Sequence, residues 1–511
     1  MMEATKGKKK SFFYRFLDFV EKAGNKLPHP FTLFVFLTLG VVLISFIVAK
    51  AGVQVKHPVK DEMVVARNLL SKEGIQYMLL NLISNFTGFR PLGLVLTMMI
   101  GIGLAEQTGL MSAFMRKFIL GAPERLLLMA VFLIGICGNL ASDAAIIIVP
   151  PLAGAIFYGA KKNPLVGVAA GYAAACAGFT ANLLIAGTDA LLAGITEEAA
   201  KIIDPSITVS PTVNYYFMFI STLVLTVVGA WITTKFVEKQ AGEYKPQGEI
   251  SLDDVEFEVS EEESKGLKSA GIVTLIYWAI IILALIPQTS ALRNAEGGLV
   301  PSPFLKGIVP FILFWFIAIG IAYGRKVGKI KSEADIPKLM STAMKDMSGY
   351  IVLVFVIAQF VGYFNWTNLG LILAVTLGGL LQAWNFTGLP MIVLVILFTM
   401  FINLFIGSGS AKWALLAPVF VPMFMMLDYS PAFAQLAYRI GDSTTNAITP
   451  LLPYFPILLG FMKKYDDNAG MGTAISYTLP YSIGFGLVWI VMIAIWFFLG
   501  LPLGPGAGVY M

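Results

Sequence analysis

The stretch Ser408-Gly-Ser-Ala-Lys-Trp413 ends one apolar run of the chain and begins another. A second polar stretch, Arg439-Ile-Gly-Asp442-Ser-Thr-Thr-Asn446-Ala-Ile-Thr-Pro450, follows in the same half and is also flanked by apolar sequence. Together they place a guanidinium, an ammonium, a carboxylate, an indole, hydroxyls and an amide among residues that would lie in a membrane. Because such groups are costly in hydrocarbon, their presence there indicates a functional site.

The composition predicts an all-α polytopic membrane protein in a lipid bilayer. Of the 511 residues, 57% are hydrophobic and 13% are charged, about half the charged fraction of an average soluble protein. Residues 31–49 contain no charged side chain, and a run of about 20 such residues can span a bilayer. Several similar runs follow. The net charge of +5 is spread over loops, which indicates membrane topology rather than a nucleic-acid partner.

The N-terminal segment, the two cysteines and the two histidines limit the kinds of site that we expect in this protein. Residues 1–30 are Lys-rich and amphipathic and precede the first span without a cleavage site, so they are expected to form a cytoplasmic N-terminal segment at the inner membrane surface. Cys137 and Cys176 lie in apolar sequence, where we expect packing residues rather than a disulfide or metal site. His29 and His57 lie outside the spans, which argues against a histidine proton relay.

The two halves of the chain carry the same order of segments. Each has a span, a polar break, a short helix, two apolar arms around a Ser-containing tip, and then a helix broken at Thr-x-Asn. Arms of this length are too short to span singly, so each pair predicts a re-entrant helical hairpin. The predicted units are a first transmembrane repeat with its hairpin, an acidic cytoplasmic linker, and a second repeat with its hairpin: 31–237 with 124–158, 238–268, and 269–511 with 390–427.

The landmarks of the two repeats are in register. Ser142 stands eight residues before Pro150, as Ser410 does before Pro418, and Thr180-Ala-Asn182 matches Thr444-Thr-Asn446. Counting membrane crossings places the two hairpins in opposite orientations. Two such units form the inverted repeat of secondary transporters, whose site lies at the midplane between broken helices.

The matched tips and breaks supply oxygen atoms that could hold Na⁺. A small hard cation prefers hydroxyl, amide and carbonyl oxygens, and unwound backbone beside such side chains would offer more of them. The alternative is that these side chains only cap the ends of half-helices. The candidate ion ligands are Asn139, Ser142, Asn182, Ser408 and Asn446. No other metal and no organic cofactor is expected; the coupling ion could be Na⁺ or H⁺.

The second half alone carries the groups suited to an anionic substrate. Arg439 offers a fork of donors for a carboxylate, and Asp442, three residues on, could instead neutralise it within the same helix.

Other side chains leave two interpretations open. In the first half, a desolvated carboxylate such as Asp189 could carry a proton, or could be a buried hydrogen-bonded side chain. Trp413 could stack on an aromatic substrate or pack in the core, and Lys412 could extend to the interface or pair with a carboxylate.

Four motifs together resemble the AbgT family, the p-aminobenzoyl-glutamate transporters of bacterial inner membranes. They are Gly138-Asn-Leu-Ala-Ser-Asp-Ala-Ala145 with Pro150-Pro151, Ala177-Gly-Phe-Thr-Ala-Asn182 with Gly187-Thr-Asp189, Gly407-Ser-Gly-Ser-Ala-Lys-Trp413, and Arg439-Ile-Gly-Asp442 with Asn446 and Pro450. The resemblance implies a homodimer whose protomers each have about nine transmembrane helices and two opposed re-entrant hairpins. The positions that match the family's functional motif are Asp189, Ser410, Trp413, Pro431, Arg439, Asp442 and Pro450.

The expected function is therefore an ion-gradient-coupled secondary transporter of a small molecule. The resemblance implies p-aminobenzoyl-glutamate or related aromatic anions as substrates, or export of sulfonamide antimetabolites; the direction is left open. The alternatives are a passive channel and a membrane-embedded hydrolase that would use Ser410 with Lys412 or Asp442. No oxyanion-hole signature is visible and the hydrolase leaves the repeat unexplained, so we do not expect an enzyme.

Overall fold

The structure, a computed structural model, describes residues 28–58, 62–141, 144–242, 244 and 258–511. Most of the predicted N-terminal segment 1–30, the tip residue Ser142 and residues 243 and 245–257 of the predicted acidic linker therefore lie outside the described residues. The described chain is helical apart from one small antiparallel pair of strands, β1 (Gln54–Lys56) and β2 (Met63–Val65).

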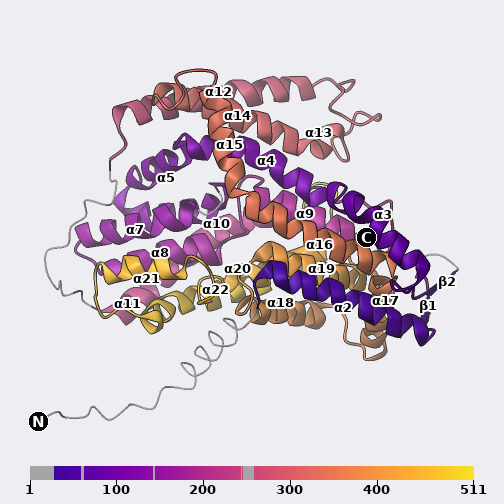
Figure 1. The fold of residues 1–511 in the computed structure, drawn as a ribbon. Helices are drawn as coiled ribbons and strands as arrows, with labels where there is room; N and C mark the ends of the chain where they lie inside the picture. The colour runs from indigo at the N-terminus through magenta and orange to yellow at the C-terminus, as the bar shows by residue number, and fades with distance from the viewer. Residues whose placement is uncertain (1–27, 59–61, 142–143, 243, 245–257) are drawn as a thin grey trace, which may run out of the picture.

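The helices alternate between long apolar rods and shorter segments (Figure 1). The first half contains α2 (Pro30–Lys50), α3 (Lys72–Thr87), α4 (Arg90–Gln107), α5 (Leu110–Leu120), α6 (Leu127–Cys137), α7 (Ala144–Gly159), α8 (Pro164–Ala177), α9 (Gly187–Ala200), α10 (Tyr215–Ile232) and α11 (Glu238–Ala241). The second half contains α12 (Glu261–Leu285), α13 (Pro303–Lys306), α14 (Ile308–Lys326), α15 (Asp335–Asp346), α16 (Ser348–Trp366), α17 (Leu369–Ala383), α18 (Leu389–Asn403), α19 (Gly409–Met425), α20 (Pro431–Thr444), α21 (Phe455–Lys463) and α22 (Met471–Leu499).

The number of spans agrees with a polytopic membrane protein. Among the described residues, seven helical segments are long and apolar enough to cross a bilayer, with α3 joined to α4 and α10 to α11. The pair formed by α5 and the helix that continues through α6, bent by 116°, would make an eighth if it is counted as one span. The α6–α7 and α18–α19 helices are shorter, as re-entrant hairpins require.

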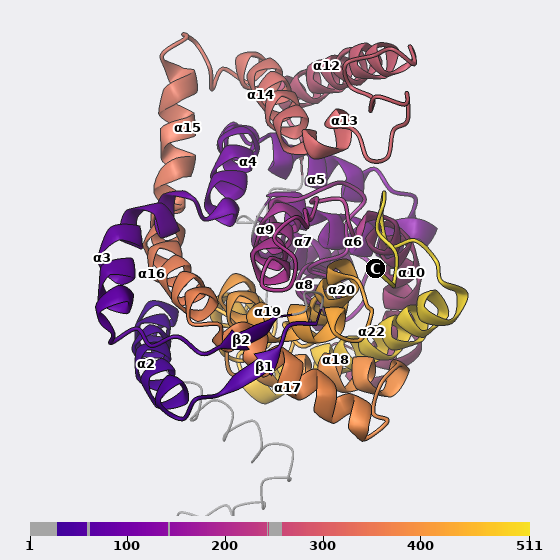
Figure 2. The same cartoon turned by 90° about the vertical axis from the view of Figure 1, so that its right-hand side faces the viewer.

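Peripheral helices surround an inner bundle. On one side α12 packs on α14, and α14 and α15 pack on α4, forming the upper part of Figures 1 and 2. Elsewhere α2 and α3 pack on α16. Only 6% of the apolar window of α12 and 17% of that of α2 are buried in the protein. Helices that are apolar all round yet so little buried suit contact with lipid.

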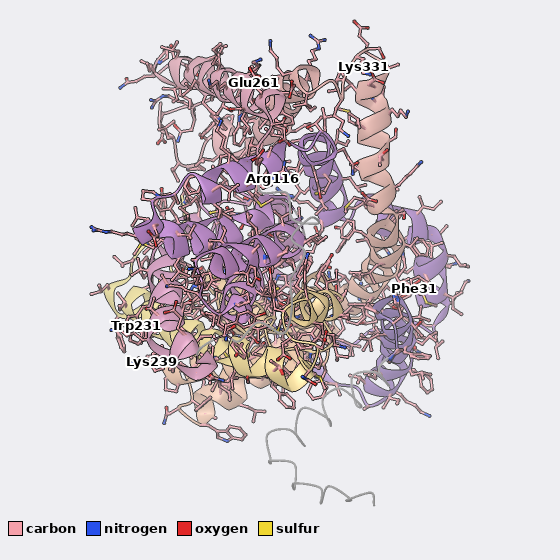
Figure 3. All side chains as sticks on the ribbon, turned by 90° about the vertical axis from the view of Figure 1, so that its left-hand side faces the viewer. Phe31, Arg116, Trp231, Lys239, Glu261 and Lys331 are labelled. Atoms are coloured by element: carbon pink, nitrogen blue, oxygen red, sulfur yellow. The ribbon has the colours of Figure 1, made fainter. Side chains whose placement is uncertain are left out.

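The start of α12 lies earlier than the sequence predicted. The Ser260 hydroxyl accepts a hydrogen bond from the backbone N–H of Glu263, and the Glu263 carboxylate accepts one from the N–H of Ser260, which is a capping box. The helix therefore begins within the predicted linker rather than at residue 269. Glu263 also forms an ion pair of 2.6 Å with Arg116 of α5, which is labelled in Figure 3.

Both hairpins pack in the same way on the helix that follows them. Helices α6 and α7 contact α8, and α18 and α19 contact α20. Helix α5 enters the first hairpin through a bend of 116°. Close approach of backbones fixes the first contact, because a Cβ atom on Gly171 of α8 would lie 2.8 Å from Pro150 Cα of α7. The repeated packing is what the two-repeat interpretation predicts; the opposed orientation of the repeats stays a prediction.

Candidate functional site

The two broken helices meet at their breaks. The Thr180 hydroxyl, just after α8, lies 2.6 Å from the Ser443 hydroxyl of α20. The backbone N–H of Thr180 also donates to the Ser443 hydroxyl, at 3.3 Å. Both hydroxyls also lie within hydrogen-bond distance of the Arg439 carbonyl. The side chains of Thr180, Ser443 and Arg439 are all buried. The structure thus brings the Thr-x-Asn break of the first repeat against the helix of the second.

Arg439 extends from this contact toward the first repeat. Its Nη2 atom lies 2.6 Å from Asp189 Oδ1 of α9 and donates a 2.7 Å hydrogen bond to the Thr180 carbonyl. Asp189 Oδ2 accepts a hydrogen bond of 2.7 Å from the N–H of Ala186, at the start of α9. Arg439 is 1% exposed, yet its Nε and Nη1 atoms have no hydrogen-bond partner among the described residues. The site therefore contains two buried and unused donors.

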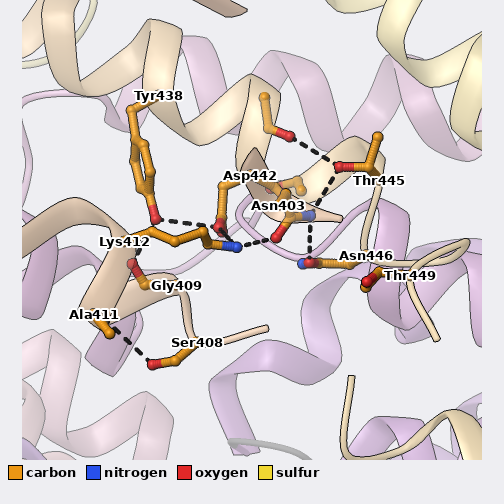
Figure 4. Close-up of polar contacts among 12 residues, drawn as sticks. Asn403, Ser408, Gly409, Ala411, Lys412, Tyr438, Asp442, Thr445, Asn446 and Thr449 are labelled. Carbon is orange, nitrogen blue, oxygen red and sulfur yellow. Dashed lines mark hydrogen bonds and ion pairs between the residues drawn. The ribbon is translucent and has the colours of Figure 1, made fainter. Parts of the chain in front are cut away.

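The alternative in which Asp442 neutralises Arg439 within one helix is not what the structure shows. Asp442 instead pairs with Lys412 of the second hairpin, with 2.6 Å between Oδ1 and Nζ (Figure 4). The two residues leave α20 toward different neighbours, Arg439 toward α9 and Asp442 toward α19. Lys412 thus takes the carboxylate-pairing alternative, and both buried cations are neutralised by carboxylates on other helices.

Asn403, the last residue of α18, was not singled out from the sequence. It is fully buried, and its Nδ2 atom lies 2.7–2.9 Å from Asp442 O, Thr445 Oγ1 and Asn446 Oδ1. Its Oδ1 atom accepts a hydrogen bond from Lys412 Nζ. Asn403 therefore joins the second hairpin to the break after α20 (Figure 4). The sequence feature that could have identified Asn403 is its amide side chain, which stands alone in the apolar run 390–406.

The tip of the second hairpin is ordered by local hydrogen bonds. The Ser408 hydroxyl caps α19 by accepting from the N–H of Ala411 and lies 3.3 Å from the Ser410 hydroxyl. The Tyr438 hydroxyl lies 2.5 Å from Gly409 O and 3.1 Å from Asp442 Oδ1. Because the Lys412 ammonium is held by Asp442 and Asn403, it does not activate Ser410, and the geometry does not support the hydrolase alternative.

Trp413 is packed inside the protein in this conformation. It is 0% exposed, stacks on Tyr438 with ring centroids 4.5 Å apart, and donates from Nε1 to Thr196 Oγ1 at 2.9 Å. Thr196 in turn lies 2.6 Å from Gln435 Oε1. The indole thus fulfils the core-packing alternative here, and a role in stacking on substrate would require the hairpin tip to move.

The candidate ion ligands that the structure describes make hydrogen bonds to other protein groups. Asn139 Nδ2 donates to Ile136 O at 3.2 Å, and Asn182 Oδ1 accepts from the N–H of Leu184 at 3.3 Å. Asn446 Oδ1 accepts from Asn403. Asn182 Nδ2 is buried without a partner among the described residues, so this side chain presents a donor rather than an oxygen. A Na⁺ role for these side chains stays a prediction.

Two prolines frame the second broken helix. Pro431 occupies the first turn of α20, after Ser430, whose hydroxyl caps the helix by accepting from the N–H of Phe433. This is the position in a helix where the missing N–H of proline is least costly. Pro450 lies between α20 and α21 and is partly exposed. Because proline disfavours continued helix, it helps to keep the two helices separate.

Two cavities lie away from these residues. A cavity of about 1160 Å³ is lined by apolar side chains of α5, α6, α12 and α14. A second, of about 530 Å³, lies beside the start of α7 and includes Glu106 and Asp346 in its wall. Neither of these two cavities is lined by Arg439, Asp442 or Trp413.

Comparisons with known proteins agree with this architecture. Residues 15–511 match the family described as "AbgT putative transporter family". The p-aminobenzoyl-glutamate transport protein of Escherichia coli K12 is 43% identical over 488 residues, covering 95% of each chain.

Two solved structures resemble the fold closely. The YdaH transporter of Alcanivorax borkumensis, which has an unusual topology, is 39% identical with a TM-score of 0.89, covering 94% of this chain and 100% of that one. MtrF of Neisseria gonorrhoeae, from a class of antimetabolite efflux pumps, is 41% identical with a TM-score of 0.90, covering 96% and 100%. The family and the E. coli relative are transporters rather than enzymes, and the chain described here belongs to the AbgT family of transporters.

Proposed function

We propose that this chain is an ion-gradient-coupled secondary transporter of p-aminobenzoyl-glutamate or related aromatic anions, with sulfonamide antimetabolites as candidates for export. The observation that carries the proposal is Arg439, a fully buried guanidinium at the contact between the repeats, two of whose donor atoms have no hydrogen-bond partner among the described residues. The names of the E. coli and N. gonorrhoeae relatives support the substrate class.

The unused donors favour an anionic ligand for a physical reason. A buried donor without an acceptor costs about 1–3 kcal/mol, and more when it carries charge. The carboxylate of a glutamate moiety would satisfy Arg439 Nε and Nη1 with charge-assisted hydrogen bonds. Asn182 Nδ2, two residues beyond the carbonyl that binds Arg439, adds a further unused donor on the same break.

Flux of labelled p-aminobenzoyl-glutamate into proteoliposomes tests the site. We expect R439Q to lower counterflow at least about tenfold, since losing a charge-assisted hydrogen bond costs about 1.5–3 kcal/mol. The matched control is R125Q, because Arg125 is exposed at the start of the first hairpin. If R439Q fails to fold, the neutral pair D189N/R439Q replaces it. Unchanged flux in folded R439Q or in that double variant would remove Arg439 from the site.

Coupling requires a separate experiment. Na⁺ and pH gradients are imposed one at a time across the same vesicles, and saturating flux driven by one of them is the expected result. Asp189 is the candidate proton carrier, and the hairpin tips and breaks are the candidate Na⁺ ligands. Flux that responds to neither gradient would end the coupling proposal, and unsaturable flux would favour the passive channel. The direction of accumulation distinguishes uptake from efflux.

We also propose a homodimer in the bacterial inner membrane with a cytoplasmic N-terminus. Basic loops such as Lys161-Lys162, Arg325-Lys326 and Lys463-Lys464 support this orientation by the positive-inside rule. The dimer is tested by light scattering of the purified protein, and the orientation by labelling single cysteines placed in these loops. Monomeric protein at all concentrations, or labelling of these loops from the periplasmic side, would contradict the respective proposals.

A further inference from the structure

We propose that the larger apolar cavity, which lies between α5, α6, α12 and α14, binds one anionic phospholipid of the bilayer. The lipid phosphate contacts Lys117 and Lys268, and the acyl chains extend to Leu140 and Leu184 at the other end of the cavity. This site is separate from the buried ion pairs, and its occupation does not depend on the proposed transport activity.

The walls of this cavity are apolar and open to the surroundings of the protein. Its volume is about 1160 Å³, and several large side chains in its wall are exposed, namely Phe114 (47%), Phe118 (43%), Leu126 (49%) and Leu275 (74%). An exposed apolar concavity of this size marks a binding site. Because only 6% of the apolar window of α12 is buried in the protein, this helix borders hydrocarbon, and acyl chains are the ligand that hydrocarbon supplies.

The cavity has the depth of one leaflet of a bilayer. Along α12 its wall extends from Leu267 to Leu275, which is about 12 Å at a rise of 1.5 Å per residue. Half of the hydrocarbon core of a bilayer is about 15 Å thick. Lys268 lies at the Leu267 end of this stretch, which is where the headgroup of such a lipid would lie.

The charged side chains in the wall are both cations. Of the residues that line the cavity, only Lys117 and Lys268 are charged. Lys117 Nζ of α5 lies 2.7 Å from Ser264 Oγ of α12, and Ser264 and Lys268, four residues apart, share one face of that helix. Among the described residues neither lysine is in an ion pair. Two ammonium groups are thus available to one phosphate.

Neighbouring charges at the start of α12 are paired with one another. Glu263 pairs with Arg116 at 2.6 Å and Glu261 with Lys265 at 2.7 Å. The Arg116–Glu263 pair also holds α5 against α12, so this end of the cavity keeps its shape. A basic pocket between transmembrane helices at the cytoplasmic surface suits anionic headgroups, and the start of α12 lies on the side that we propose to be cytoplasmic.

The other end of the cavity is formed by the first repeat. Leu140 belongs to the tip of the first hairpin and Leu184 to the break after α8. The Tyr215 hydroxyl donates to the Leu183 carbonyl at 3.0 Å, which fixes the break beside the cavity. Acyl chains in this space would contact α12 and α14 on one side and the first hairpin on the other, so a bound lipid should stabilise the packing of these elements.

A second copy of the chain suits the cavity less well than a lipid. Covering it with protein would remove the Lys117 and Lys268 ammonium groups from water without giving them an anion. Burial of an unpaired charge is costly. An anionic lipid, in contrast, supplies the apolar chains and the negative charge in one molecule.

The first test compares two lipids that differ only in headgroup charge. Phosphatidylglycerol and phosphatidylcholine with identical acyl chains are added to purified full-length protein, and bound lipid is measured by native mass spectrometry. We expect wild type to bind phosphatidylglycerol more tightly, and K117Q/K268Q to bind it about tenfold more weakly because both cations are lost. The matched control is K235Q/K239Q, since Lys235 and Lys239 are exposed, follow α10 and do not line the cavity. Lys239 lies well apart from Arg116 in Figure 3.

The second test blocks the apolar part of the cavity. A Cβ atom on Gly271, in the α12 wall, meets nothing within 4 Å, so the ring of G271F can enter the cavity without displacing a helix. We expect this variant to bind both lipids more weakly. G379F is the control, because Gly379 of α17 is equally open and does not line the cavity. If G271F does not fold, G271L replaces it.

Each result supports or overturns the proposal. Equal binding of the two lipids by wild type, or equal weakening in K117Q/K268Q and K235Q/K239Q, would overturn it. Unchanged lipid binding in folded G271F would also overturn it, and a simultaneous change from dimer to monomer would show that a second copy of the chain covers the cavity. The readout needs no transport, so failure of lipid binding is distinguishable from failure of the proposed function.

Discussion

Asp189 and Arg439 form a buried pair whose partners lie in different repeats. Such a pair adds little net stability compared with apolar residues, but removing one partner leaves an uncompensated charge and costs about 3–5 kcal/mol. We therefore expect D189N to lower the free energy of unfolding by about 3 kcal/mol. The double variant D189N/R439M should recover much of this loss, because it removes both charges.

The measurement is a double-mutant cycle from unfolding midpoints in detergent. E238Q serves as control, because Glu238 pairs with Lys162 where both side chains are solvent-accessible, at 29% and 53% exposed. An exposed pair contributes about 0–1 kcal/mol, so this variant should shift the midpoint little. Equal effects of D189N and E238Q would contradict the importance given to burial of the Arg439 pair.

Trp413 offers a second prediction, which separates packing from substrate contact. W413F keeps the ring stacked on Tyr438 and loses the hydrogen bond to Thr196, so it should cost about 1 kcal/mol of stability and leave the KM for substrate unchanged. The matched control is W489F, since Trp489 is also 0% exposed and donates to Ser221 at 2.8 Å. A higher KM in W413F but not in W489F would instead indicate stacking on an aromatic substrate.

The polar residues could be found from the sequence, but their partners could not. Arg439, Asp442 and Asp189 were recognisable because charges are rare in apolar sequence. Spacing along one helix suggested that Arg439 pairs with Asp442, whereas the actual partners come from α9 and α19. Tertiary packing decides such contacts, and no local pattern encodes it. Asn403 was overlooked because it stands alone in its run and has no counterpart in the first repeat.

At the scale of elements, the contact between the first hairpin and α8 depends on close backbone approach. G171A would place a Cβ atom 2.8–2.9 Å from the Pro150 Cα and N atoms and the Val149 carbonyl oxygen. Because these are backbone atoms that cannot rotate away, α7 and α8 must separate, which we expect to cost about 1–3 kcal/mol. G93A is the control, since a Cβ atom on Gly93 of α4 would meet nothing within 4 Å, and alanine there should stabilise the helix slightly. The measurement is the unfolding midpoint of each variant. Equal midpoints for G171A and G93A would contradict the tight contact between α7 and α8.

Helices were more predictable than the segments between them. Polar tips, Gly and Pro marked the ends of α6, α7, α18 and α19, because these residues disfavour continued helix. The strands β1 and β2 were not predicted, since three-residue strands in a polar segment carry too short an alternation to detect. The early start of α12 followed from its capping box, a signal present in the sequence but assigned to the linker.

For the whole molecule, we expect transport to move the two repeats past each other at their breaks, where Thr180 contacts Ser443. In an inverted-repeat transporter, alternating access comes from movement of one unit against the other around a central site. The two hydroxyl oxygens are 2.6 Å apart, so cysteines at both positions would bring sulfur atoms within reach of a disulfide. We expect oxidised T180C/S443C, made in a C137A/C176A background, to lose flux and to regain it on reduction.

The single variants T180C and S443C, treated with the same oxidant, control for damage and for the loss of the hydroxyl network. Unfolding midpoints before and after oxidation verify that the cross-link forms in folded protein, and a rise is expected because a disulfide restricts the unfolded chain. Full cross-linking with undiminished flux would show that the breaks stay in contact throughout the cycle. Movement would then be confined to the hairpins, with the Lys412–Asp442 pair as the part that opens.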